Sequence, residues 1–217
     1  MKIKYNYVIF NLYSYALLHL VQIICKEIDM AKFEFIKPEI EGLVVVKPTV
    51  FGDDRGFFME TYHKGEFSAA GITAEFVQDN HSKSSKGVLR GLHFQTENTQ
   101  GKLVRVIKGE VFDVAVDCRP DSKTFGKWYG VTLSAENKMQ FYVPEGFAHG
   151  FLVLSDEAEF VYKCTDIYNP QAEGGIPYND TTVNVEWPQV DCEIKLSEKD
   201  KKHPAFADWS FDCFKKY

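Results

Sequence analysis

The sequence of 217 residues predicts an all-β domain built as an antiparallel sandwich or barrel. Short runs of β-branched and aromatic residues follow one another closely, separated by Gly, Pro, Asn and Asp. Aromatic residues make up 15% of the chain, which favours strands over a helical bundle. Strands and helices do not alternate along the sequence, so a parallel nucleotide-binding sheet is disfavoured.

Each predicted strand is an apolar or aromatic run that stops at turn-forming residues. Strands are expected at residues 42–50, 57–62, 88–94, 103–107, 111–117, 128–133, 140–143, 150–154, 159–164 and 183–187. Helical periodicity is confined to residues 64–70 and to a short piece after Leu196. Many short strands with so few helices predict a β domain with short peripheral helices.

Residues 1–29 are expected to be an extension outside the domain, which then spans residues 30–217 without an internal repeat or linker. Residues 8–24 form an apolar run that follows Lys2 and Lys4, as in a signal peptide. No small-residue cleavage site follows, and the run is short and polar for a membrane span. The residues that follow Met30 are typical of a natural protein start, so an upstream start codon is the favoured explanation of residues 1–29. A membrane-surface helix and a signal sequence are the alternatives.

Charge and cysteine content bound the partners of this protein. A net charge of −6 argues against nucleic-acid binding, which requires a basic surface, but it is compatible with a local basic pocket for one phosphorylated small molecule. The five cysteines are odd in number and form no CxxC pair, so a disulfide framework and a structural zinc site are disfavoured. A reducing compartment, the cytoplasm, is therefore expected, with no membrane partner.

Three stretches hold polar residues where strands should be apolar, at residues 51–61, 76–93 and 144–151. In a small barrel, inward-facing positions are filled by side chains or surround a ligand. Arg90 and His93 are three residues apart and would point to opposite faces of a regular strand. A bulge at Gly91 would bring them together. A hydrogen-bonded core histidine is the competing interpretation of His93.

A metal site is the other chemistry to weigh. His93, Glu97 and His149 offer the two histidines and one carboxylate of a non-haem iron site. Metal-binding cupin barrels resemble this arrangement, but they carry a His-x-His pair followed by Glu. The residues two before and two after His93 are Gly91 and Gln95. The spacing therefore predicts that no metal is bound.

Five long motifs occur in order between about residue 40 and residue 200: FGDDRGFFMETY, FVQDNHSKSSKGVLRGLHFQ, QGKLVRVIKGEVFDVAVDCRP, LSAENKMQFYVPEGFAHGF and LSEKD. Together they resemble the dTDP-4-dehydrorhamnose 3,5-epimerase family. The resemblance implies an antiparallel jelly roll of cupin type that is active as a homodimer without metal or cofactor. It implies 3,5-epimerisation of dTDP-4-dehydro-6-deoxy-D-glucose to dTDP-4-dehydro-L-rhamnose. The alternative is a relative that epimerises only C3 or only C5 of a related dTDP-ketosugar.

The resemblance also implies catalytic roles. His93 corresponds to the base, Asp200 to its paired carboxylate and Tyr162 to the proton donor. Lys102 corresponds to the basic residue near the sugar C4 carbonyl. These residue types suit the chemistry of epimerisation. A C4 ketone acidifies the hydrogens at C3 and C5, and an imidazole is an effective base near neutral pH.

The same resemblance implies the substrate contacts. Tyr168 corresponds to a tyrosine that stacks on thymine, and Phe51 and Arg55 would reach into the partner subunit's site. The remaining nucleotide contacts fall on Glu60, Gln78, Asn80, Arg90, His149, Glu173 and Lys199. Asp113 matches a recurrent acidic position to which no role is assigned.

Overall fold

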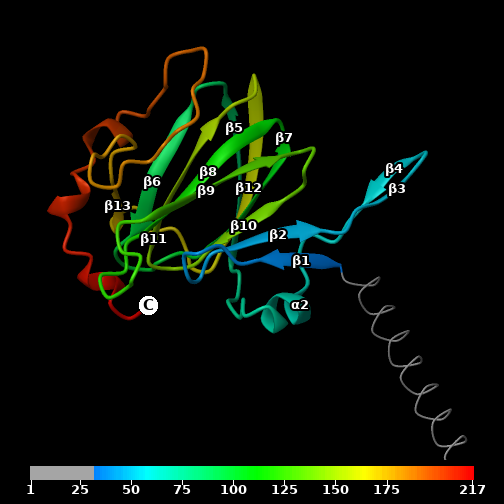
Figure 1. Ribbon diagram of the computed structural model, residues 1–217, viewed down its shortest axis with the longest axis horizontal. Helices are drawn as coiled ribbons and strands as arrows, with labels where there is room; N and C mark the ends of the chain where they lie inside the picture. Colours follow the sequence, from blue (N-terminus) through cyan, green and yellow to red (C-terminus); the bar gives the residue numbers. More distant parts are fainter. Residues whose placement is uncertain (1–31) are drawn as a thin grey trace, which may run out of the picture.

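Two antiparallel β-sheets face each other in the computed structural model, which describes residues 32–217 (Figure 1). One sheet contains β1 (Phe33–Ile36), β2 (Val44–Pro48), β5 (Gln78–Ser85), β7 (Lys102–Lys108), β10 (Gln140–Val143) and β12 (Glu157–Cys164). The other contains β6 (Leu89–Gln95), β8 (Glu110–Asp117), β9 (Trp128–Ser134), β11 (Phe147–Val153) and β13 (Glu173–Gly175). A separate hairpin consists of β3 (Phe51–Asp53) and β4 (Gly56–Phe58).

Most neighbouring strands in the two sheets are distant in sequence. The six-stranded sheet has the order β1-β2-β10-β7-β12-β5 and the five-stranded sheet the order β13-β6-β11-β8-β9. The helical elements are short and peripheral: α2 (Lys64–Ala69), η1 (Asp200–Lys202), η2 (Phe206–Asp208) and η3 (Asp212–Phe214). The predicted all-β antiparallel jelly roll of cupin type is therefore confirmed.

Most predicted strands are present with small shifts at their ends. The strand predicted at residues 183–187 is wrong, because that segment is an irregular strap that packs Val183, Val185 and Trp187 into a hydrophobic cluster. Of the strand predicted at residues 57–62, only the part up to Phe58 is formed. β1, β3, β5 and β13 are missing from the prediction. β5 reads QDNHSKSS, a polar sequence that an edge strand paired only with β12 tolerates.

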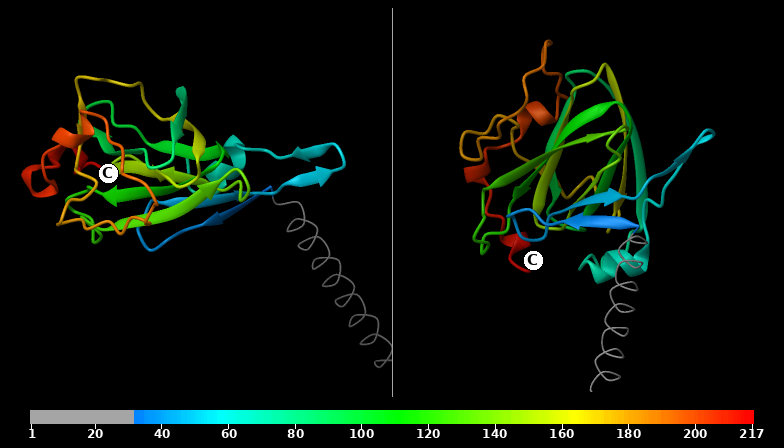
Figure 2. Two further views of the ribbon diagram at one scale, coloured as in Figure 1. Left: turned by 90° about the horizontal axis from the view of Figure 1, so that it is seen from above. Right: turned by 45° about the vertical axis from the view of Figure 1, so that its right-hand side comes forward.

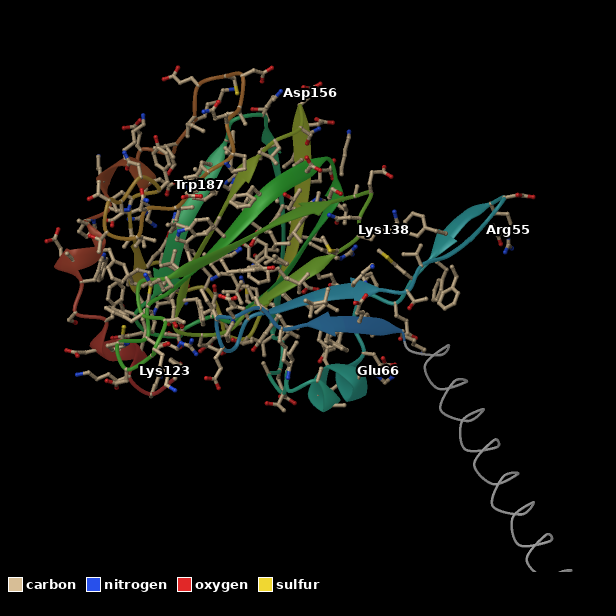
Figure 3. All side chains as sticks on the ribbon, viewed as in Figure 1. Arg55, Glu66, Lys123, Lys138, Asp156 and Trp187 are labelled. Atoms are coloured by element: carbon tan, nitrogen blue, oxygen red, sulfur yellow. The ribbon has the colours of Figure 1, made fainter. Side chains whose placement is uncertain are left out.

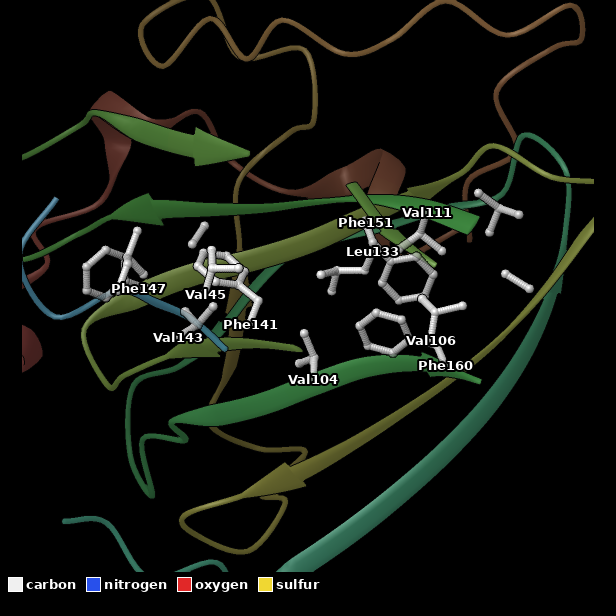
Figure 4. Close-up of a cluster of buried hydrophobic side chains, with 14 of the residues drawn as sticks. Val45, Val104, Val106, Val111, Leu133, Phe141, Val143, Phe147, Phe151 and Phe160 are labelled. Carbon is white, nitrogen blue, oxygen red and sulfur yellow. The ribbon is translucent and has the colours of Figure 1, made fainter. Parts of the chain in front are cut away.

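The main hydrophobic core lies between the two sheets (Figure 4). Val104, Phe141 and Phe160 reach it from the six-stranded sheet, and Val111 and Leu133 from the five-stranded sheet; all are buried. Side chains at alternate positions of a strand share a face, so each strand directs one set of apolar residues inward. Burying each large apolar side chain contributes roughly 1.5–3 kcal/mol.

The C-terminal segment covers the outer face of the five-stranded sheet (Figure 1, red). Phe206, Phe211 and Phe214 are buried there against Phe94 of β6 and Val114 of β8. The sequence indicated no role for this tail. Its aromatic anchors fix the path of the chain that follows Leu196, including η1, next to β6.

The hairpin β3–β4 projects away from the two sheets (Figures 1 and 2). Phe57 is 60% exposed and Phe58 is 67% exposed. A two-stranded hairpin is marginally stable on its own in water. The ammonium of Lys138 lies 4.7 Å from the ring centroid of Phe57, and both aromatic side chains are otherwise largely uncovered within residues 32–217.

The predicted extension, residues 1–29, lies outside the described residues. Within residues 32–217, no helix has the length and apolar character needed to cross a bilayer.

A buried carboxylate fixes the connection that follows β8. The fully buried side chain of Asp117 accepts hydrogen bonds from Arg119 Nε at 2.9 Å, Ser122 Oγ at 2.6 Å and Thr124 Oγ1 at 2.6 Å. Burial alone would raise the pKa of Asp117, but these donors outweigh it and lower the pKa. The ionised carboxylate therefore stabilises the folded state.

Asp117→Asn should lower the free energy of unfolding by about 3 kcal/mol at pH 7, because Arg119, whose side chain is 13% exposed, loses its charge partner. The folded-state pKa of Asp117 lies below its unfolded value of about 3.9, so the stabilisation is present above that pH and is lost as the pH falls through the folded-state pKa. Urea unfolding from pH 7 toward about pH 3 should show the difference from wild type shrinking. Asp191→Asn, at an exposed pair with Lys86, is the control and should have little effect. A pH-independent difference would contradict the prediction.

Candidate active site

A cavity of about 570 Å³ is lined by both sheets and by the C-terminal segment. The predicted site residues that line it are His93, Asp200, Tyr162, Lys102, Arg90, His149, Tyr168, Glu173 and Lys199. These residues come from four of the five sequence motifs and from the chain between them. The fold therefore brings most of the predicted chemistry to one place.

A β-bulge at Gly91 lets Arg90 and His93 share this cavity. His93 lies opposite His149 of β11, whereas Arg90 lies opposite Phe151, so β6 contains one residue more than β11 between these pairs. Gly91 has a φ of +139°, and a Cβ there would lie 2.5 Å from the Cα of Gly150. Only glycine fits such a position. The bulge considered from the sequence is present.

His93 and Asp200 form a hydrogen-bonded pair. His93 Nε2 lies 2.6 Å from Asp200 Oδ1, and the Asp200 side chain is only 5% exposed. Burial alone would raise the pKa of Asp200, but His203, His93 and the hydroxyl of Ser197 hold it well below its usual range. Asp200 is therefore a carboxylate, and Nε2 of His93 must be the donor. This leaves Nδ1 as the nitrogen with a free lone pair.

A second histidine–carboxylate pair lies on the neighbouring strands β11 and β8. His149 Nε2 is 2.8 Å from Asp113 Oδ1, and both side chains are buried. Burial raises the pKa of Asp113, and the contact with His149 opposes this shift. Asp113, which had no role from the sequence, therefore orients the ring of His149.

The iron triad weighed from the sequence is not assembled. Glu97 is exposed in the loop after β6 and is not grouped with His93 and His149 in a potential ion site. Each of these histidines is instead paired with an aspartate.

Tyr162 and Lys102 line the wall opposite His93. Tyr162 lies on β12 and Lys102 on β7, adjacent strands of the six-stranded sheet, whereas His93 lies on the five-stranded sheet. Burial raises the pKa of Tyr162. Burial also lowers the pKa of Lys102. Nearby acidic groups, among them Glu145, oppose this shift. The tyrosine hydroxyl is therefore kept protonated, and the ammonium group lies in a poorly hydrated setting.

Tyr168, Glu173 and Lys199 form a linked group at the cavity. Tyr168 Oη donates a hydrogen bond of 2.5 Å to Glu173 Oε2, and Lys199 forms an ion pair with the same carboxylate. The hydrogen bond to Glu173, together with burial, raises the pKa of Tyr168 to about 12. Gln78 Oε1 accepts a hydrogen bond of 2.9 Å from the backbone N–H of Tyr168. The ring of Tyr168 is thereby held at the cavity while half exposed.

Five predicted contact residues do not line this cavity in the single chain: Phe51, Arg55, Glu60, Gln78 and Asn80. Arg55 is on the projecting hairpin, ion-paired with Asp53 (Figure 3), and Phe51 is on the same hairpin. Glu60 is paired with Lys32 at 2.7 Å. Asn80 donates to the thiol of Cys164 and lines a second, smaller cavity.

The structure adds His203 and Ser197 to the site. Ser197 Oγ accepts a hydrogen bond from the backbone N–H of Asp200, and the ring of His203 lies against the ring of His93. His203 is in the tail from which the sequence indicated nothing. Its position three residues after Asp200 was the one available signal, and spacing alone does not show that such a short turn is buried.

Comparison with known proteins agrees with this geometry. A sequence model of the dTDP-4-dehydrorhamnose 3,5-epimerase family matches residues 37–208. The chain is 54% identical to the dTDP-4-dehydrorhamnose 3,5-epimerase of Methanothermobacter thermautotrophicus, over 79% of this chain and 94% of that protein. It is 59% identical to the enzyme of the same name from Shigella flexneri, over 80% of this chain and 96% of that protein.

Solved structures give the same assignment. The 3,5-epimerase of Legionella pneumophila in complex with dTDP-4-keto-L-rhamnose has a TM-score of 0.82 and 49% identity, covering 85% of this chain and 98% of that one. A 3'-monoepimerase of Streptomyces bikiniensis in complex with dTDP-quinovose has a TM-score of 0.74 and 33% identity, covering 78% of this chain and 86% of that one. Together with the paired histidine and the partly buried tyrosine of the cavity, these similarities show that the chain belongs to the dTDP-4-dehydrorhamnose 3,5-epimerase family.

Proposed function

We propose that this chain is an isomerase that converts dTDP-4-dehydro-6-deoxy-D-glucose into dTDP-4-dehydro-L-rhamnose by 3,5-epimerisation. One observation carries this function: a His–Asp pair and a partly buried tyrosine lie on opposite walls of one cavity. Inversion at carbon requires a base on one face and an acid on the other. The relatives that share more than half of their residues with this chain carry the same activity in their names.

His93 is the base for both steps. The C4 ketone acidifies the hydrogens at C3 and C5, and Nδ1 of His93 accepts one of them as a proton. Asp200, bonded to Nε2, holds the tautomer that leaves Nδ1 free. The same carboxylate stabilises the imidazolium that forms.

Lys102 and Tyr162 complete each inversion. When the proton leaves, the electron pair of the C–H bond moves toward the C4 oxygen, and the ammonium of Lys102 stabilises the resulting enolate. The hydroxyl of Tyr162 then returns a proton to the opposite face of the same carbon. Exchange with solvent restores the protonation states of His93 and Tyr162, so the net change is an isomerisation without an oxidant or reductant.

The nucleotide part of the substrate contacts the polar rim of the cavity. Arg90 and Lys199 bind the diphosphate. The guanidinium of Arg90 pairs with phosphate oxygens in a fork, and the ammonium of Lys199 acts as a point charge. Tyr168 stacks on the thymine. The remaining proposed contacts are Glu60, Gln78, Asn80, His149 and Glu173.

Epimerisation at a single carbon is the second candidate, because a 3'-monoepimerase shares this fold. The chain is 33% identical to that protein, against 54% and 59% for the two 3,5-epimerases. The higher similarity favours the double reaction. Analysis of the product formed from the dTDP-ketosugar distinguishes the two.

The reaction uses no metal ion and no cofactor. The charge that develops on the C4 oxygen is stabilised by Lys102, and the proton transfers are made by His93 and Tyr162. We also propose the cytoplasm as the compartment, because Cys118, Cys164, Cys192 and Cys213 are free thiols.

The active unit is a homodimer in which each hairpin β3–β4 completes the partner's site. Phe51 and Arg55 project from the body of their own chain, and Phe57 and Phe58 of the same hairpin are exposed. A second copy of the chain would cover these aromatic side chains. It would also bring the charge of Arg55 to a substrate diphosphate.

His93→Asn should lower the incorporation of solvent deuterium at both C3 and C5 by about 100-fold or more, because one base serves both steps. The measurement is NMR or mass spectrometry of the dTDP-ketosugar after incubation in D₂O. His81→Asn, at an exposed histidine that is also paired with a carboxylate, is the control and should exchange normally. Exchange at the wild-type rate at either carbon would contradict the assignment of a single base.

Prolonged treatment of the wild-type enzyme with a chelator should leave its turnover undiminished, because protein side chains supply the base, the acid and the cation. Turnover is followed by product formation, with metal content measured in parallel. A loss of activity that added iron or zinc restores would overturn the metal-free mechanism.

Arg55→Ala should weaken substrate binding while leaving the folded dimer intact, since a charge-assisted hydrogen bond contributes about 1.5–3 kcal/mol. A mixture of Arg55→Ala and His93→Asn subunits tests whether Arg55 acts across the interface. If it does, one site of each heterodimer carries both defects and the other site is intact. Mixing should then restore up to about half of the wild-type activity per heterodimer.

The control for this mixing experiment is subunit exchange verified by mass. If Arg55 acts within its own chain, every heterodimer site carries one defect and no activity returns. That result, with exchange verified, would contradict the shared site.

A further inference from the structure

His203 is a buried histidine whose Nε2 has no hydrogen-bond partner among residues 32–217. Its side chain is only 7% exposed, and Nε2 lies 3.5 Å from Asp200 Oδ1. Its ring lies at 72° to the ring of His93, with centroids 5.5 Å apart. The contact with Asp200 is an ion-pair contact and not a hydrogen bond, and a buried polar atom without a hydrogen bond costs about 1–3 kcal/mol.

The fold makes room for this imidazole. A Cβ at Gly175 of β13 would lie 2.6 Å from the ring of His203, so the absence of a side chain there lets the ring reach Asp200. His203 follows Asp200 by one short 3₁₀ turn, η1, and Pro204 comes next. The ring is therefore held by packing on two sides.

Three donor atoms converge at this point. One ligand atom each from His93, Asp200 and His203 lies within 4.8 Å of the other two. Two imidazole nitrogens and one carboxylate oxygen are a donor set that suits Zn²⁺ and similar ions and disfavours Mg²⁺ and Ca²⁺. The second histidine–carboxylate pair, His149 and Asp113, has no third ligand of this kind.

We propose that His93, Asp200 and His203 bind one Zn²⁺ ion, and that this ion inhibits the epimerase reversibly. Tetrahedral zinc with ligands at 2.0–2.1 Å needs donor atoms about 3.3 Å apart. His203 Nε2 and Asp200 Oδ1 are already 3.5 Å apart. His93 Nε2 and Asp200 Oδ1 are 2.6 Å apart and must separate by less than about 1 Å.

The inhibition follows from the tautomer of His93, and it rests on the proposed role of this residue as the base. Zinc binds the lone pair of Nε2 and replaces its hydrogen bond to Asp200. A neutral imidazole keeps one proton, which then resides on Nδ1. Nδ1 is the atom that must accept the substrate proton, so the zinc-bound histidine is blocked without any change in its oxidation state.

Binding is tested separately from activity with Co²⁺, whose absorption spectrum reports its ligands. The full chain should bind one equivalent of Co²⁺ and show the visible bands of a tetrahedral nitrogen and oxygen site, without a thiolate charge-transfer band. Zn²⁺ should displace it. His203→Phe and the size-conserving His203→Gln should lose this spectrum, and His81→Gln should keep it. Binding that survives both His203 substitutions, or that shows thiolate ligation, would overturn the site.

Inhibition is tested by titrating turnover with ZnCl₂, each variant being compared with its own zinc-free activity. Wild type and His81→Gln should be inhibited and then recover on addition of a chelator. Loss of one ligand should raise the zinc concentration for half-inhibition by about tenfold or more in His203→Gln. Full turnover with zinc demonstrably bound would overturn the inhibitory role. If the chain turns over no dTDP-ketosugar at all, the proposed function fails, while the Co²⁺ spectra still decide the metal site.

Discussion

The hydrogen bond between His93 and Asp200 depends on most of the fold. It joins β6 to η1 across 107 positions of sequence. On one side, the bulge at Gly91 turns His93 into the same cavity as Arg90. On the other side, the aromatic anchors of the C-terminal segment hold Asp200 beside β6. A short polar contact in the cavity is thus maintained by hydrophobic packing on the opposite face of the sheet.

The jelly roll supplies two walls, and the chemistry uses both. The proposed base lies on the five-stranded sheet, and the proposed donor and cation lie on the six-stranded sheet. Burial acts on both sides: it raises the pKa of Tyr162 and lowers that of Lys102, while hydrogen bonds keep Asp200 ionised despite its burial. The arrangement that pairs His93 with Asp200 also places a second imidazole, His203, next to the same carboxylate. Imidazole nitrogens and a carboxylate oxygen are also metal-ligand atoms.

The fold class followed from local patterns, since period-two runs and turn residues are sufficient to show many short antiparallel strands. The errors have physical causes. The segment at residues 183–187 has strand-like composition because it is buried, but it lies over the five-stranded sheet and not within it. β5 is polar because one of its edges has no partner strand within residues 32–217. β1 is a short edge strand paired with β2, and β13 is a three-residue strand whose pairing depends on the distant β6.

The sequence by itself determined the fold class and the candidate site residues, because the local motifs around His93, Lys102, Tyr162 and Asp200 carry the resemblance to the family. It also indicated that a bulge at Gly91 would be needed. Only the tertiary structure decided which of these side chains meet, since contacts across 107 positions and a one-residue register shift depend on packing far from the site. For the same reason it alone revealed the pairing of His149 with Asp113 and the burial of His203. Arg55 and Phe51 match their motif, but in the single chain they do not line the cavity, because they lie on a hairpin that projects away from the two sheets.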